Sequence, residues 1–118
     1  MENLLSLLLQ ARNAVHVLHW KTKSFSLHLA LGELYDILSD MADELAEMSI
    51  GAHGDLGEVP LSGLSIEPGL PPEVFIQQLF DILAKIKPSI PQDDWLINKY
   101  EELQAEVSKI KYKIENLK

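Results

Sequence analysis

The strongest constraint on the fold is a stretch of glycines and prolines in the middle of the chain. Nine of them fall between Gly51 and Pro72, and such a cluster disfavours a continuous helix or a central strand. On both sides of it, apolar residues recur every three or four positions, which is the spacing of a helix with one buried face. The strand-like alternation and the Asn-Gly turns of a β fold do not occur in the sequence. The pattern therefore predicts an all-α protein whose two helical halves are joined by a long connection.

Two helices are predicted before the glycine- and proline-rich stretch. The first covers residues 2–20, and after a short loop at 21–25 the second covers residues 27–50. Either Ser24 or Ser26 can serve as its N-cap, because a serine hydroxyl accepts a hydrogen bond from a free backbone N–H of the first turn. The short loop predicts that these two helices form an antiparallel hairpin.

Two further helices are predicted after the stretch. The third begins at Pro71 or Pro72 and ends before Pro88, because proline is favoured in a first helical turn and excluded from a helix interior. The fourth begins near Pro91 and has a heptad seam suited to nearly parallel packing, formed by Leu96, Tyr100, Leu103, Val107, Ile110, Ile114 and Leu117. The predicted fold of residues 1–118 is a single-domain, ferritin-like four-helix bundle with one long crossover between helices 2 and 3, and the alternative is some other small four-helix bundle.

Composition narrows the classes of function. The chain has no cysteine, which excludes disulfide scaffolds, thiolate metal sites and cysteine nucleophiles. Its net charge of −8 and isoelectric point near 4.8 disfavour DNA binding, since an acidic surface repels phosphate. Neither a signal peptide nor an apolar run of membrane-spanning length is recognised. We therefore expect a soluble, cytoplasmic protein without a membrane partner.

Charge is distributed unevenly along the chain. Between Ser24 and Ala84 there are eleven carboxylates and neither a lysine nor an arginine. At about 100° per residue, six positions of the second helix share roughly one third of its circumference, namely His28, Gly32, Asp36, Asp40, Asp43 and Glu47. This stripe is interpreted either as an ordinary solvated face or as a surface that binds a cation, because like charges one turn apart repel each other.

Three of the four histidines, His16, His19 and His28, lie close together in the sequence, and His53 falls in the glycine-rich stretch, where we expect it to be exposed. His19 and His28 flank the tight turn between the first two helices, so they are expected to be near each other. The Glu-x-x-His pattern of di-iron sites inside a single bundle does not occur in the sequence. A metal site built wholly within one bundle is therefore not expected.

Several short segments together resemble the Dps-type mini-ferritins (DNA protection during starvation). The resemblance lies in His19-Trp20, in Phe25-Ser26-Leu27-His28, in Leu34-Tyr35-Asp36, in Asp43-Glu44-Leu45-Ala46-Glu47, and in Gly57-Glu58-Val59-Pro60-Leu61. It covers roughly residues 10–62. It implies a Dps-like iron-binding protein that oxidises and sequesters Fe²⁺ and so protects against oxidative damage, with a ferroxidase-type oxidoreductase activity.

The resemblance also implies a site shared between two subunits. His19 and His28 match the histidines that one chain supplies, and Asp43 and Glu47 match the carboxylates of its two-fold partner. Asp43 lies 15 residues after His28, about 22 Å along a helix, so one chain cannot close the site, whereas two antiparallel copies of the helix can. Mixed imidazole and carboxylate ligands suit iron, with zinc or manganese as possible alternatives. A homo-oligomer is therefore expected, at least a dimer, and the resemblance extends this expectation to the dodecamer of that family.

The chain differs from the family pattern in three respects. The loop between the histidines is about three residues shorter, the basic N-terminal tail that some members use on DNA is missing, and Gly32 occupies the position of a carboxylate ligand. Glu33 is adjacent but points about 100° away, and Asp36 lies one turn further on. Two alternatives to an iron oxidase follow, namely a non-catalytic structural or interaction protein with a degenerate metal site, and a redox-silent binder of divalent cations.

Overall fold

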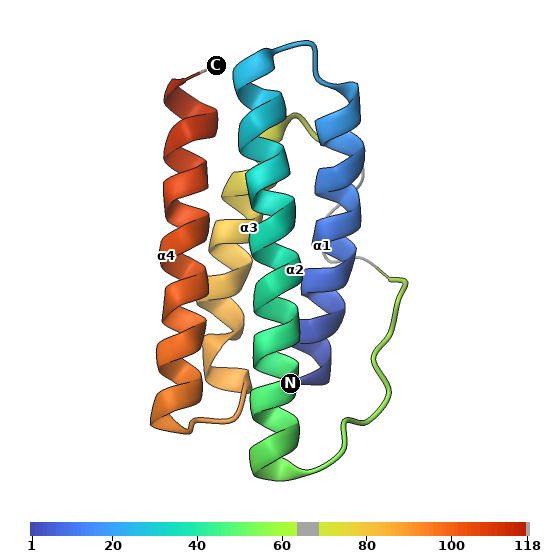
Figure 1. Ribbon diagram of the computed structural model, residues 1–118, viewed down its shortest axis with the longest axis vertical. Coiled ribbons are helices and arrows are strands. Elements are labelled where there is room, and N and C mark those ends of the chain that lie inside the picture. Colours follow the sequence, from blue (N-terminus) through green and yellow to red (C-terminus); the bar gives the residue numbers. More distant parts are fainter. Residues whose placement is uncertain (64–68, 118) are drawn as a thin grey trace.

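Four α-helices make up most of the chain in the computed structural model (Figure 1), which describes residues 1–63 and 69–117. They are α1 (Glu2–Lys21), α2 (Phe25–His53), α3 (Pro72–Ile86) and α4 (Asp94–Asn116), with a single 3₁₀ turn, η1 (Lys87–Ser89), after α3. No strand occurs in the described ranges. The all-α prediction and the number of helices are therefore confirmed. Pro68, one of the predicted helix-breaking residues, lies outside the described residues.

The helices lie side by side along the long axis of a molecule that measures 43 × 26 × 21 Å. Around the bundle, α1 packs against α2, α2 against α4, α4 against α3, and α3 against α1. Figure 1 shows that α1 and α4 run in one direction and that α2 and α3 run in the other. The chain therefore has to return along the length of the bundle between α2 and α3, as the predicted long crossover requires.

The core is an almost wholly aliphatic layer along the bundle axis. Each helix contributes residues at three- and four-residue spacing, and the fully buried side chains include Leu8, Leu34, Leu79 and Leu103. The heptad seam of α4 is buried from Leu96 to Ile114, as predicted, and only its last member, Leu117, is exposed. Burial of such side chains contributes about 1.5–3 kcal/mol each, so this layer is the main source of the bundle's stability.

α2 starts earlier and ends later than the sequence pattern predicts. Ser24 is the N-cap, and its hydroxyl accepts a hydrogen bond from the Leu27 N–H at 3.3 Å. The helix continues through Gly51 to His53 and ends at Gly54, whose φ of 87° is a conformation that favours glycine. His53 therefore ends a helix instead of lying in a loop, and its Nε2 is 2.8 Å from the Asp93 carboxylate at the start of α4.

The first part of the crossover is tied to α1. The Gly57 N–H donates a hydrogen bond of 2.8 Å to the Glu2 carboxylate, and this bond lowers the pKa of Glu2. One turn further along α1, the Ser6 hydroxyl donates to the Pro60 carbonyl and accepts a hydrogen bond of 2.7 Å from the Gln10 amide. These contacts hold the connection against the side of the bundle that is made by α1.

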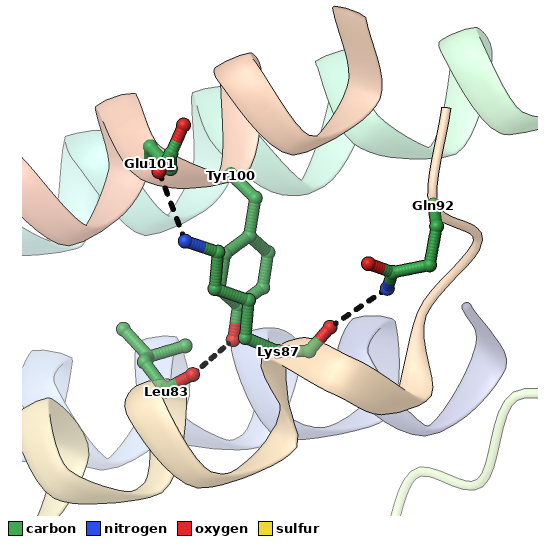
Figure 2. Close-up of polar contacts among 5 residues, drawn as sticks. All are labelled: Leu83, Lys87, Gln92, Tyr100 and Glu101. Atoms are coloured by element: carbon green, nitrogen blue, oxygen red, sulfur yellow. Dashed lines mark hydrogen bonds and ion pairs between the residues drawn. The ribbon is translucent and has the colours of Figure 1, made fainter. Parts of the chain in front are cut away.

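The turn from α3 to α4 is held by a second group of polar contacts (Figure 2). The Tyr100 hydroxyl donates to the Leu83 carbonyl at 2.6 Å, and burial raises the pKa of this tyrosine. Next to it, Lys87 pairs with Glu101 at 2.9 Å, and Gln92 donates to the Lys87 carbonyl at 3.1 Å. These bonds join the end of α3 to the first turns of α4 and so fix the second hairpin.

Candidate functional site

His19 and His28 form a stacked pair at the turn between α1 and α2. Their ring centroids are 3.7 Å apart and the rings are inclined by 20°. His19 Nδ1 donates a hydrogen bond of 2.7 Å to the backbone carbonyl of His28, and His28 Nδ1 donates one of 3.0 Å to the carbonyl of His19. The carbonyl of His19 lies in the last turn of α1, where no helical N–H is available to it. The reciprocal bonds therefore close the turn and fix both rings.

These bonds also fix the tautomer of each neutral ring. A carbonyl oxygen can only accept, so Nδ1 must carry the proton in both histidines. In a neutral imidazole the other nitrogen, Nε2, then has a free lone pair. An Nδ1–H that donates to a backbone carbonyl is the arrangement in which metal-binding histidines are commonly held. Both side chains are half-buried, and together they offer two pre-oriented nitrogen ligands.

Gly32 makes room for this pair. A Cβ at position 32 would lie 3.1 Å from Cε1 and 3.3 Å from Nδ1 of His19, which is closer than ordinary van der Waals contact. In the Dps-type family that the sequence resembles, this position holds a carboxylate. Here it has a different role, because the His19 ring occupies the space beside it. This explains why a glycine, which disfavours a helix interior, stands in the middle of α2.

A shallow pocket continues from the histidine pair along the groove between α1 and α2. It is lined by both histidines and by His16, Gly32, Tyr35 and Asp36. The His16 ring packs between the rings of Trp20, at 4.2 Å, and Tyr35, at 4.4 Å. Asp36 thus contributes a carboxylate to the lining of the pocket that both histidines share, and its role as a metal ligand stays a prediction.

Asp43 and Glu47 lie on the same side of α2 as Asp36, two to three turns further along the helix, and both are exposed. They are not brought to the histidines of their own chain. In the described parts of the chain, no group of three or more histidine, aspartate or glutamate side chains could hold a metal ion. One copy alone therefore supplies two neighbouring imidazoles, and no described carboxylate of the same chain, Asp36 included, completes a three-ligand group with them.

Four carboxylates of α2, which we call the outer acidic face, form no ion pair with the residues that the structure describes. They are Asp36, Asp40, Asp43 and Glu47. Carboxylates nearer α4 are paired: Lys113 binds Glu33 at 2.9 Å and Lys99 lies 3.6 Å from Glu44. The uneven charge of the sequence is thus partly balanced in the fold, and the outer acidic face is the part that stays unbalanced.

Exposed apolar side chains flank the outer acidic face at both ends, a feature that sequence reasoning missed. Trp20, Phe25 and Leu29 are 65%, 75% and 56% exposed at the histidine end, and Ile50 is 40% exposed at the other end. The exposure of Trp20 excludes it from the core of its own chain. Such a surface is typical of a contact with another molecule.

None of the helices in the described part of the chain has the length and hydropathy needed to cross a bilayer.

Comparison with known proteins gives one match. A family model described as a family of unknown function (DUF5856) matches residues 19–114, which include both histidines of the stacked pair and the whole outer acidic face. No curated protein and no solved structure matches the chain.

Proposed function

The chain belongs to the DUF5856 family, which is described as a family of unknown function, and from the histidine pair and the sequence resemblance we propose that it is a Dps-like, ferritin-like iron-binding protein. In this proposal two copies pair antiparallel along α2. His19 and His28 of one copy and Asp43 and Glu47 of the other bind Fe²⁺, and Asp36 is an additional carboxylate near the site. The pairing creates two equivalent sites per dimer.

The observation that carries the proposal is the fixed tautomer of the histidine pair. Two half-buried imidazoles that both donate from Nδ1 to backbone carbonyls have both Nε2 atoms free to bind a metal. A structural role for the pair explains the closed turn. It gives no reason for the adjacent pocket with Asp36, nor for an unpaired acidic face on the same helix.

The exposed apolar residues support an antiparallel arrangement. Phe25 and Leu29 are at one end of the outer face of α2 and Ile50 is at the other. An antiparallel pair brings Phe25 of each copy toward Ile50 of its partner and buries apolar surface at both ends. A parallel pair would place the two acidic halves side by side, where like charges repel. The antiparallel pair instead places the histidine end of each copy beside the acidic half of its partner.

The chemistry that suits this ligand set is one-electron oxidation of iron. Two Fe²⁺ ions give two electrons to one molecule of hydrogen peroxide, which takes up two protons and leaves as two waters. Carboxylates stabilise the higher charge of Fe³⁺, and imidazoles bind both oxidation states. Iron is the substrate in this scheme, and the protein residues hold it and place it out of bulk water.

Titration of the protein with Fe²⁺ and hydrogen peroxide, followed by ferric absorbance, tests the proposal. We expect a saturable rise that His28→Ala and Asp43→Ala each abolish, because each removes ligands from both sites of a dimer. Matched controls are His53→Ala, a histidine at the far end of α2 that pairs with Asp93, and Glu44→Ala, a neighbouring carboxylate that faces Lys99. Both controls should keep the rise.

If the parent protein shows no saturable rise in ferric absorbance, the proposed oxidase activity is contradicted. The same titration with Zn²⁺ or Mn²⁺, read by the melting temperature, then separates the two remaining candidates, since a ligand that binds only the folded state raises that temperature. A shift would support redox-silent cation binding. The absence of a three-ligand group within the described part of one chain favours the other candidate, a non-catalytic interaction protein, which predicts no shift.

A further inference from the structure

The chain's single arginine lies beside the candidate site and has no ion pair with the residues that the structure describes. Arg12 is in α1, one turn before His16, and its guanidinium carbon is 5.8 Å from the centroid of the Tyr35 ring. One terminal nitrogen donates a long hydrogen bond of 3.5 Å to Asn13, and Nε is buried without a hydrogen-bond partner. A guanidinium presents five donors in a rigid fork that matches a carboxylate, and most of these donors are unused.

The unpaired arginine and the outer acidic face are complementary but do not meet within one chain. Arg12 lies on the α1 side of the groove between α1 and α2, and Asp36 lines this groove from the α2 side, whereas Asp40 and Asp43 border the groove between α2 and α4. Tyr35 contacts Arg12 in this groove. We propose that Arg12 of one copy binds Asp36 of a second copy, and that this pair of contacts fixes the register of the antiparallel dimer. The inference rests on the proposed function and adds to it the residue that selects the partner.

The heights of the residues along the bundle agree with this assignment. In the hairpin, His19 lies level with His28, and Arg12 lies level with Tyr35. If His28 lies level with Asp43 to Glu47 of a partner, antiparallel symmetry places Asp36 level with residues 35–39 of that partner. This is the height of the partner's own Arg12. The register that completes the metal site therefore also brings each Arg12 to the level of the opposite Asp36.

The contact also removes a difficulty of the dimer. Near the two-fold axis, the Asp36 and Asp40 side chains of the two copies approach one another, and no lysine of the described chain pairs with them. Like charges at an interface disfavour association. One arginine from each copy supplies the missing positive charges at this level, and a bidentate pair with a carboxylate also gives orientation. Arg12 is thus a positioning residue for the dimer and does not bind iron itself.

A charge exchange between two variants tests the inference. Arg12→Glu places two acids at each contact of its homodimer, and Asp36→Lys places two cations there. In a mixed dimer of the two variants, both symmetry-related contacts have opposite charges again. By sedimentation, with EDTA and separately with anaerobic Fe²⁺, we expect each variant alone to have a dimer dissociation constant raised about tenfold or more. The equimolar mixture should return to within about threefold of the parent value.

The control is Lys85→Glu. It changes the net charge by the same amount as Arg12→Glu, but it lies on α3, away from the face that is proposed to pair. It should dimerise as the parent does. Normal dimerisation of Arg12→Glu, or a mixture that does not recover, would overturn this inference and leave the proposed iron site standing. A parent chain that is monomeric under both conditions would overturn the proposed function and this inference together.

Discussion

Gly32 and Gly51 are both inside α2, yet their surroundings differ. Next to Gly32 the His19 ring fills the space that a side chain would occupy, with 3.1 Å between Cε1 and an added Cβ. Nothing lies within 4 Å of a Cβ added at Gly51. One glycine therefore serves the histidine pair, whereas the other only weakens the last turn of the helix. Gly32 is thus required by the packing of the His19 ring, whereas Gly51 has only the low helix propensity that is usual for glycine.

Substitution of each glycine by alanine tests this distinction. Gly51→Ala should raise the free energy of unfolding by up to about 1 kcal/mol, the usual difference between these residues in a helix. Gly32→Ala should lose most of that gain, because the His19 ring must shift and its bond to the His28 carbonyl must lengthen. Denaturant unfolding measures the difference, and Fe²⁺ affinity should fall only for Gly32→Ala. Equal stabilisation by both variants would contradict the packing role of Gly32.

At the scale of helices and loops, much of the fold was predictable from the sequence. The glycine and proline cluster and the heptad seam of α4 determine four helices, and the structure confirms them. The N-cap could not be chosen between Ser24 and Ser26, and the start at Phe25 was missed. The reason is that Phe25 is exposed and so does not extend the buried periodicity. The order of the helices around the bundle could not be predicted from the apolar pattern either, because it depends on contacts such as that between Lys113 and Glu33, which are 80 residues apart.

The candidate site was predictable only in its local part. The nearness of His19 and His28 follows from a short turn between two helices. Their reciprocal hydrogen bonds depend on side-chain rotamers, which spacing does not reveal. The sequence also does not show that Arg12 lacks an ion pair, because this can be seen only when the positions of the other charged side chains are known. Whether Asp43 and Glu47 complete a metal site stays a prediction.

The attachment of the crossover to α1 has a pH dependence of known sign. The Gly57 N–H bond stabilises the charged form of Glu2 and lowers its pKa below the usual 4.5. The stabilisation is therefore present above pH 4.5 and is lost as the pH falls through the lowered pKa. In an NMR titration, the Gly57 amide proton should shift with a midpoint below 4.5, and Glu2→Gln should remove that shift. A midpoint at or above 4.5 would contradict the contact.

On the scale of the whole molecule, the bundle has two unlike sides. Toward α4, Glu33 and Glu44 of α2 are balanced by Lys113 and Lys99, and toward the core α2 packs with aliphatic side chains. The outer face of α2 combines an unpaired acidic stripe, a free arginine nearby and exposed aromatic side chains. In the proposed antiparallel dimer, each of these features faces a partner on the second copy. We therefore propose that the metal site is shared between two chains.

Complementation between two inactive variants measures that claim most directly. His28→Ala lacks the imidazole, and the double variant Asp43→Asn with Glu47→Gln lacks the carboxylates, so each alone should show no saturable Fe²⁺ oxidation. In a mixed dimer, one of the two shared sites has all its ligands. Co-expression in equal amounts should therefore restore about one quarter of the parent activity, because half of the dimers are mixed and each has one intact site. If the mixture is shown to contain mixed dimers and still has no activity, a site shared between subunits is contradicted.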